Sequence, residues 1–130
     1  MSLEDVLENV NYNIEKIVVE LRKRIEGIPG ITETVDKSKI IYQYSGKNFC
    51  LINIKKDYLE IDFKIGNDLV DPVAFSWKIG RTKRSEFDNR MHMKNIFDID
   101  VVFNIISQSY NYTAKNRDKS SSNQKYRKKY

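Results

Sequence analysis

Residues 58–65 read Tyr58-Leu59-Glu60-Ile61-Asp62-Phe63-Lys64-Ile65, with an apolar side chain at every second position. Because successive side chains of a β-strand point to opposite faces, this alternation predicts a strand with one apolar and one polar face. Two β-branched and aromatic runs precede it, at residues 39–44 and 49–54, and residues 45–48 and 55–57 are typical turn residues. Short turns between such runs are typical of antiparallel hairpins, so we predict a meander of three strands.

An amphipathic helix is predicted before the meander. From Leu3 to Arg24, apolar residues recur at intervals of three and four, Ser2 can cap the helix, and Ile28-Pro29-Gly30 ends it. The same rhythm is typical of a coiled-coil seam and of a helix packed on its own sheet. We favour packing within the chain, and a homodimer through this helix is the alternative.

The rest of the chain predicts one more strand and one more helix. Residues 31–35 are interpreted as an extended entry, residues 66–89 as irregular, and residues 91–96 as a fourth strand. A final helix follows Asp98, with apolar residues at helical spacing as far as Tyr110. We therefore predict an α+β fold of two layers, an antiparallel sheet of about four strands with the N- and C-terminal helices on one face. This single domain is placed at residues 1–113.

Positive charge is concentrated at the C-terminal end. The formal net charge is +5, yet residues 1–114 carry 16 basic and 17 acidic side chains, whereas residues 115–130 carry seven basic and one acidic. From about Thr113 onward no periodic apolar residue remains, so residues 114–130 are predicted to form a disordered basic tail. Basic composition indicates nucleic acid, and here it does so only for the tail.

Composition also bears on location and on redox chemistry. The apolar runs are far shorter than the roughly 20 residues of a membrane helix, and the acidic start is not typical of a signal peptide, so we predict a cytoplasmic protein without membrane contact. The single cysteine, Cys50, cannot form an intramolecular disulfide, and its apolar neighbours predict a buried thiol.

Several short motifs resemble a known family. They are Lys39-Ile40-Ile41-Tyr42-Gln43-Tyr44, Gly46-Lys47-Asn48-Phe49, Lys55-Lys56, Asp71-Pro72, Ser76, Ile79-Gly80, Asp98-Ile99-Asp100-Val101 and Ile105-Ile106-Ser107-Gln108-Ser109-Tyr110. In this order they resemble a small bacterial and archaeal domain of unknown function, often found at the C-terminus of proteins labelled "predicted transport protein". The resemblance covers roughly residues 24–112, and at residues 80–88 the chain departs from the family's pattern of His-Trp-Gly. It implies an α+β accessory domain, sometimes fused to nuclease-like or restriction-associated domains.

The polar face of residues 58–65 is the first candidate for chemistry. Glu60, Asp62 and Lys64 share this face, and two carboxylates with a lysine can hold a divalent metal ion and stabilise a phosphate transition state. Charge alternation is equally typical of the solvent face of an antiparallel strand. We predict a solvated strand face without a metal or cofactor and keep a metal-dependent nuclease as an alternative. His92, the only histidine, is predicted to be a strand-face residue and not a general base.

The second candidate is a set of cations that could contact nucleic acid. Arg81, Lys83 and Arg84 form a basic loop that could bind a phosphate backbone. The nearby Trp77 is interpreted as an anchor in the core. The tail adds the four cations Lys125, Arg127, Lys128 and Lys129. We predict a non-catalytic accessory or interaction domain that contacts DNA or RNA weakly and without sequence preference through this loop and the tail. The alternatives are a homodimer or other protein-interaction module and the nuclease.

Overall fold

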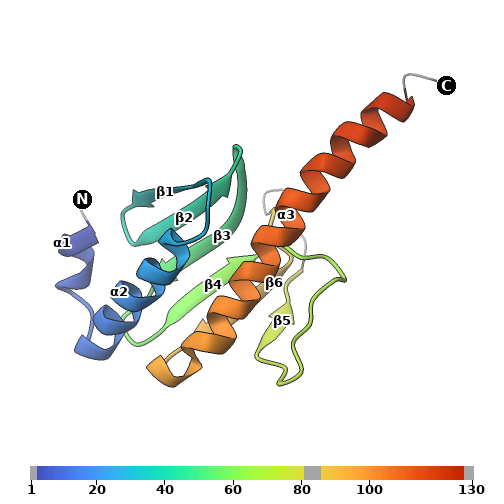
Figure 1. The fold of residues 1–130 in the computed structure, drawn as a ribbon. Helices are drawn as coiled ribbons and strands as arrows, with labels where there is room; N and C mark the ends of the chain where they lie inside the picture. The colour runs from blue at the N-terminus through green and yellow to red at the C-terminus, as the bar shows by residue number, and fades with distance from the viewer. Residues whose placement is uncertain (1–2, 81–85, 128–130) are drawn as a thin grey trace.

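The computed structural model describes the backbone of residues 3–80 and 86–127 and the side chains of residues 3–80 and 86–116. Along the chain, helices precede and follow a run of strands (Figure 1). The elements are α1 (Leu3–Leu7), α2 (Tyr12–Glu26), β1 (Ile31–Asp36), β2 (Lys39–Tyr44), β3 (Lys47–Ile54), β4 (Leu59–Phe63), β5 (Ser76–Lys78), β6 (Asn89–Met93), the 3-10 turn η1 (Ile96–Asp98) and α3 (Ile99–Arg127).

All strands join one antiparallel sheet in the order β1-β2-β3-β4-β6-β5. The first four strands form the hairpins that short turns predict. The sheet has two strands more than the predicted four. The segment predicted to be an extended entry is β1, and β5 lies within the stretch predicted to be irregular. The turn before β5 depends on Asp71, whose carboxylate accepts hydrogen bonds from the N–H groups of Phe75 (3.0 Å) and Ser76 (2.8 Å).

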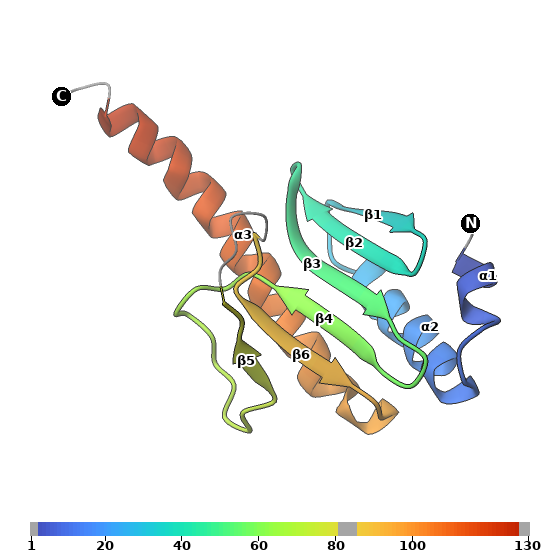
Figure 2. The same ribbon diagram turned by 180° about the vertical axis from the view of Figure 1, so that it is seen from behind.

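Both long helices pack on the same face of the sheet. Figure 1 shows α2 and α3 in front of the strands, and Figure 2 shows the opposite face with no helix over it. The apolar residues of the alternating strands meet the helices in a single core, which includes Leu59, Ile61 and Phe63 from β4. The predicted α+β class and two-layer arrangement are confirmed.

The N-terminal helix differs from the prediction because it is interrupted. α1 ends at Leu7, and α2 begins at Tyr12 after Asn11, whose backbone is extended (ψ 161°). The Asn11 Oδ1 atom accepts the N–H of Ile14 at 2.9 Å, which is the usual geometry of an N-cap. The apolar seam of α2 is buried in the core, so it packs within the chain as favoured. These seam residues are Ile14, Ile17, Val18, Leu21 and Ile25.

The C-terminal helix runs beyond the predicted domain boundary at residue 113. The backbone of α3 is helical to Arg127, and its C-terminal half projects away from the sheet in both views (Figures 1 and 2). Residues 114–130 are predicted to be disordered. The side chains from residue 117 onward lie outside the described part of the chain, so this stays a prediction. Among the described residues, no helix is both long enough and apolar enough to span a bilayer.

Candidate functional site

The open face of the sheet carries a cluster of polar and aromatic side chains from β4, β6 and β5. The register of β4 and β6 places Glu60 opposite His92 and Asp62 opposite Arg90. Because their strand neighbours point into the core, these four side chains point away from the helices, toward the face that Figure 2 presents. Trp77 of β5 lies opposite Arg90 and joins them.

Asp62 and Arg90 form a two-pronged ion pair at the centre of this cluster. Arg90 Nε donates to Asp62 Oδ1 at 2.7 Å, and a terminal nitrogen donates to Oδ2 at 3.1 Å. The hydrogen bond that it donates to Asp62 raises the pKa of the Arg90 guanidinium. Asp62 is only 6% exposed, so the predicted solvated strand face is wrong at this position. The arginine from the neighbouring strand covers the carboxylate.

His92 lies between two aromatic rings on the same face. Its ring centroid is 4.6 Å from that of Tyr58 and 4.9 Å from that of Trp77, which it meets edge-on at 82°. We call Tyr58, His92 and Trp77 the aromatic row. The prediction of a strand-face histidine is confirmed, whereas the interpretation of Trp77 as a core anchor is wrong, because its side chain is 44% exposed at the edge of the sheet.

Glu60 lies beside the aromatic row and shares the Arg90 guanidinium with Asp62. Glu60 Oε1 is 3.4 Å from His92 Nε2 and 3.7 Å from an Arg90 nitrogen. The His92 Nε2 atom is shielded from solvent, and it has no hydrogen-bond partner in the part of the chain that the structure describes. The face therefore offers aromatic surface, with both of its carboxylates next to the Arg90 guanidinium.

This arrangement differs from a metal site. Within residues 3–80 and 86–116, no group of three or more histidine, cysteine, aspartate or glutamate side chains is close enough together to hold a metal ion. Lys64 lies beyond the end of β4, and its side chain lines a different groove with Lys47, Glu86 and Tyr112. The three predicted site residues therefore do not converge: Glu60 and Asp62 stay together, and Lys64 does not join them.

The side chains of the basic residues predicted to contact nucleic acid lie outside the part of the chain that the structure describes. Arg81, Lys83 and Arg84 lie outside the described residues, as do Lys128 and Lys129. Lys125 and Arg127 belong to the helical backbone of α3, and their side chains are not described. Their predicted contact with nucleic acid stays a prediction.

The motif residues near the end of the family-like region hold the fold together. The Ser109 hydroxyl donates to the Phe49 carbonyl (2.6 Å), accepts the Lys64 N–H (3.1 Å) and lies 2.9 Å from the Lys64 carbonyl. The Gln108 amide pairs with both backbone groups of Val70. Tyr110 packs edge-on against Phe49, with ring centroids 5.6 Å apart. Ser109 and Tyr110 thus dock α3 on the sheet, and Gln108 joins it to the segment between β4 and β5.

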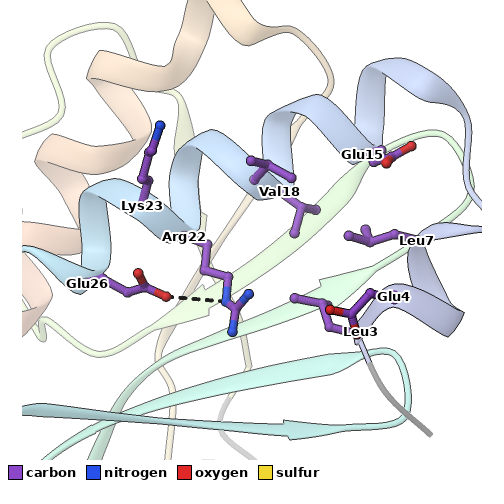
Figure 3. A pocket seen from close by; sticks show the side chains of 9 residues that line it. Leu3, Glu4, Leu7, Glu15, Val18, Arg22, Lys23 and Glu26 are labelled. Carbon is purple, nitrogen blue, oxygen red and sulfur yellow. Dashed lines mark ion pairs between the residues drawn. The ribbon is translucent and has the colours of Figure 1, made fainter.

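A second hollow lies between α1 and α2, on the helical side of the molecule. Figure 3 shows Leu3, Leu7 and Val18 lining this groove of about 370 Å³, with Arg22 and Glu26 paired at one end. We call it the α1–α2 groove.

Arg22, which lines this groove, also binds the partly buried carboxylate of Glu33. It donates two hydrogen bonds to Glu33 Oε1 and Oε2, at 2.7 Å and 2.9 Å, and the Tyr42 hydroxyl donates to Glu33 at 2.8 Å. Burial raises the pKa of Glu33, but these hydrogen bonds outweigh it, so the pKa lies below its ordinary value. Burial and the bond to Glu33 raise the pKa of Tyr42. The network ties α2 to β1 and β2.

Cys50 has no place in either hollow. It is fully buried in the core, as predicted, and burial raises the pKa of its thiol far above the ordinary value.

One family matches the chain. The family model, described as a domain of unknown function (DUF5655), covers residues 4–113. No curated protein and no solved structure matches the chain. The predicted resemblance to a domain of unknown function is confirmed, and nothing in these comparisons links the domain to a transport protein.

Proposed function

Because the chain belongs to the DUF5655 family of domains of unknown function, we propose its function from the geometry of the open sheet face. The protein is a non-catalytic accessory domain that binds single-stranded nucleic acid without sequence preference. The aromatic row stacks on bases, and the cations of residues 81–84 and of the C-terminal segment bind phosphates.

The observation that carries this proposal is the exposure of Trp77 on a sheet face that no described helix covers. Trp77 is 44% exposed and lies in line with His92 and Tyr58. Proteins that bind single strands stack bases on aromatic side chains displayed by a sheet, because every base has a π-face. An uncovered aromatic row is suited to this type of contact.

The charges of the face are compatible with a polyanion. Asp62 is neutralised by Arg90, and Glu60 lies within 3.7 Å of the same guanidinium. In the sequence, Arg81, Lys83 and Arg84 follow Trp77 by four to seven positions. Binding through such cations releases counterions and therefore weakens steeply as salt rises.

The same ion pair supports a non-catalytic role. A nuclease centre at Glu60 and Asp62 would need the Asp62 carboxylate as a metal ligand, but Arg90 donates to both of its oxygens. Placing a divalent cation there would first require the loss of a partly buried, two-pronged pair, which is among the stronger side-chain interactions.

The proposal is tested by tryptophan fluorescence, since Trp77 is the only tryptophan. Titration with oligodeoxythymidylate should quench its emission, and fluorescence anisotropy of a labelled oligonucleotide gives the affinity. Stacking is worth about 1–3 kcal/mol per base, so Trp77→Ala should weaken binding roughly 5- to 150-fold. Phe97→Ala is the matched control, because Phe97 is 92% exposed and lies in the helical layer.

Deletion of residues 115–130 separates the two parts of the proposal. It should lower affinity and flatten the dependence on salt while the oligonucleotide still quenches Trp77. Binding that neither Trp77→Ala nor the deletion weakens would refute the proposal. The absence of any binding at low salt would refute it as well and would favour a protein partner.

A further inference from the structure

The outer side of α2 presents apolar side chains that nothing in the described chain covers. Tyr12 is 75% exposed and Val19 is 52% exposed, one heptad apart on the same side of the helix. Phe97, 92% exposed, lines a small groove next to them together with Lys16. Three of the six exposed large apolar side chains of the described residues therefore gather on or beside this helix. An apolar patch of this kind marks an interaction surface.

Grooves flank this surface on both sides. The α1–α2 groove, shown in Figure 3, lies on one side of Val19. On the other side, Val19 and Tyr12 line a groove of about 460 Å³ with Ile96 and Ile99. The exposed side of α2 is thus a ridge between two hollows, which is the shape that another helix can pack against.

The charged side chains beside the ridge indicate which kind of surface is complementary to it. Glu15, Lys16, Glu20 and Arg24 line the groove on the edge that faces Ile99, where Arg24 Nε lies 3.9 Å from Glu20 Oε1, and Lys16 and Glu20 are one turn apart. A helix running antiparallel with the same sequence would place its Glu20 beside Lys16 and its Lys16 beside Glu20. A parallel copy related by a two-fold axis along the helices would instead place this edge beside the opposite edge of its partner, so Lys16 and Glu20 would not meet their counterparts. The edge is therefore complementary to itself about a two-fold axis.

We propose that a second copy of this chain packs antiparallel on the outer side of α2. Val19 contacts the partner's Val19, and Tyr12 enters the groove beside the partner's Ile99. Lys16 pairs with Glu20 of the partner subunit, and the reverse pair forms by symmetry. The contact is one helix wide, so it gives a monomer–dimer equilibrium that depends on concentration. This inference is independent of the proposed nucleic-acid contact, which uses the opposite side of the molecule.

Sedimentation velocity of the full chain across a concentration series tests the dimer. Val19→Asp removes one buried apolar contact from each subunit, worth about tenfold per copy, so association should weaken roughly 100-fold. Val73→Asp is the matched control, because Val73 is 65% exposed and lies away from α2. It should leave the dimer intact.

A charge exchange tests the antiparallel arrangement independently of stability. Lys16→Glu and Glu20→Lys should each weaken the dimer, and the double substitution should restore it, since the pairs re-form with their signs exchanged. Circular dichroism checks that each variant is folded. A wild-type monomer at every concentration, a dimer indifferent to Val19→Asp, or a double variant without recovery would each overturn the proposal.

Discussion

Replacement of Ser109 by alanine removes a hydroxyl that joins α3 to two strands. The register of β3 and β4 ends at Cys50 and Phe63, so Phe49 and Lys64 come next without a ladder pair between them. The fully buried Ser109 hydroxyl lies at this point and bonds to the backbone of both residues. In the Ser109→Ala variant, the Phe49 carbonyl and the Lys64 N–H lose this partner.

The expected cost follows from these unsatisfied groups. A buried backbone group without a partner costs about 1–3 kcal/mol, and part of this loss is recovered by relaxation, so we expect a destabilisation of about 2 kcal/mol. For a domain of this size, that corresponds to a fall of roughly 8 °C in the melting temperature. Urea unfolding followed by circular dichroism measures the free energy, with an unchanged m-value showing that the unfolded state is comparable.

Ser107→Ala is the control, since Ser107 lies two residues earlier on the same helix. Its hydroxyl donates to the Phe103 carbonyl within α3 (2.8 Å) and touches no strand. Alanine has a higher helix propensity, so the change should stay within about 0.5 kcal/mol of wild type. Equal effects of the two substitutions would show that Ser109 does not join the helix to the sheet.

Two further predictions concern the partly buried Glu33 and the buried Cys50. Glu33→Gln should lower the unfolding free energy at pH 7 by about 1–2 kcal/mol, because it weakens the bonds to Arg22 and Tyr42. The folded-state pKa of Glu33 is depressed, so in wild type this contribution is present above the unfolded-state pKa and is lost as pH falls through the folded-state pKa. Urea unfolding between pH 7 and pH 3 should therefore show a shallower pH dependence in the variant, and parallel curves would contradict this. Cys50 should react with a thiol reagent at pH 8 only after unfolding, because burial raises its pKa; labelling of the native protein at the rate of the unfolded chain, read by mass spectrometry, would contradict its placement.

Sequence correctly predicts the elements in which the alternation or helical spacing of apolar residues extends over the whole element. β4 is an example, because each of its apolar residues meets the helices and each polar neighbour faces away. The interruption at Asn11 was missed because the apolar rhythm continues across it, although an asparagine before an apolar run is a typical N-cap. β5 was missed because three residues are too few for a period, and its position depends on the turn at Asp71.

The site was less accessible to sequence reasoning. Glu60 and Asp62 were singled out by their spacing along one strand, but the residues opposite them come from another strand, 32 and 28 positions later. Arg90 and His92 meet them only through the register of β4 and β6, which no local pattern specifies. The exposure of Trp77 likewise depends on β5 being an edge strand, since the same residue on a central strand would be buried.

The position of β5 has a consequence for the energetics of any ligand that uses Trp77. Within the described residues, the strand pairing of β5 comprises three residue pairs with β6. Segments with so few contacts open locally at a small fraction of the global unfolding free energy, and a ligand that binds only the closed form must supply the ordering free energy. Occupancy of the face should therefore slow amide hydrogen exchange in residues 76–78 and couple recognition to the local order of the sheet edge.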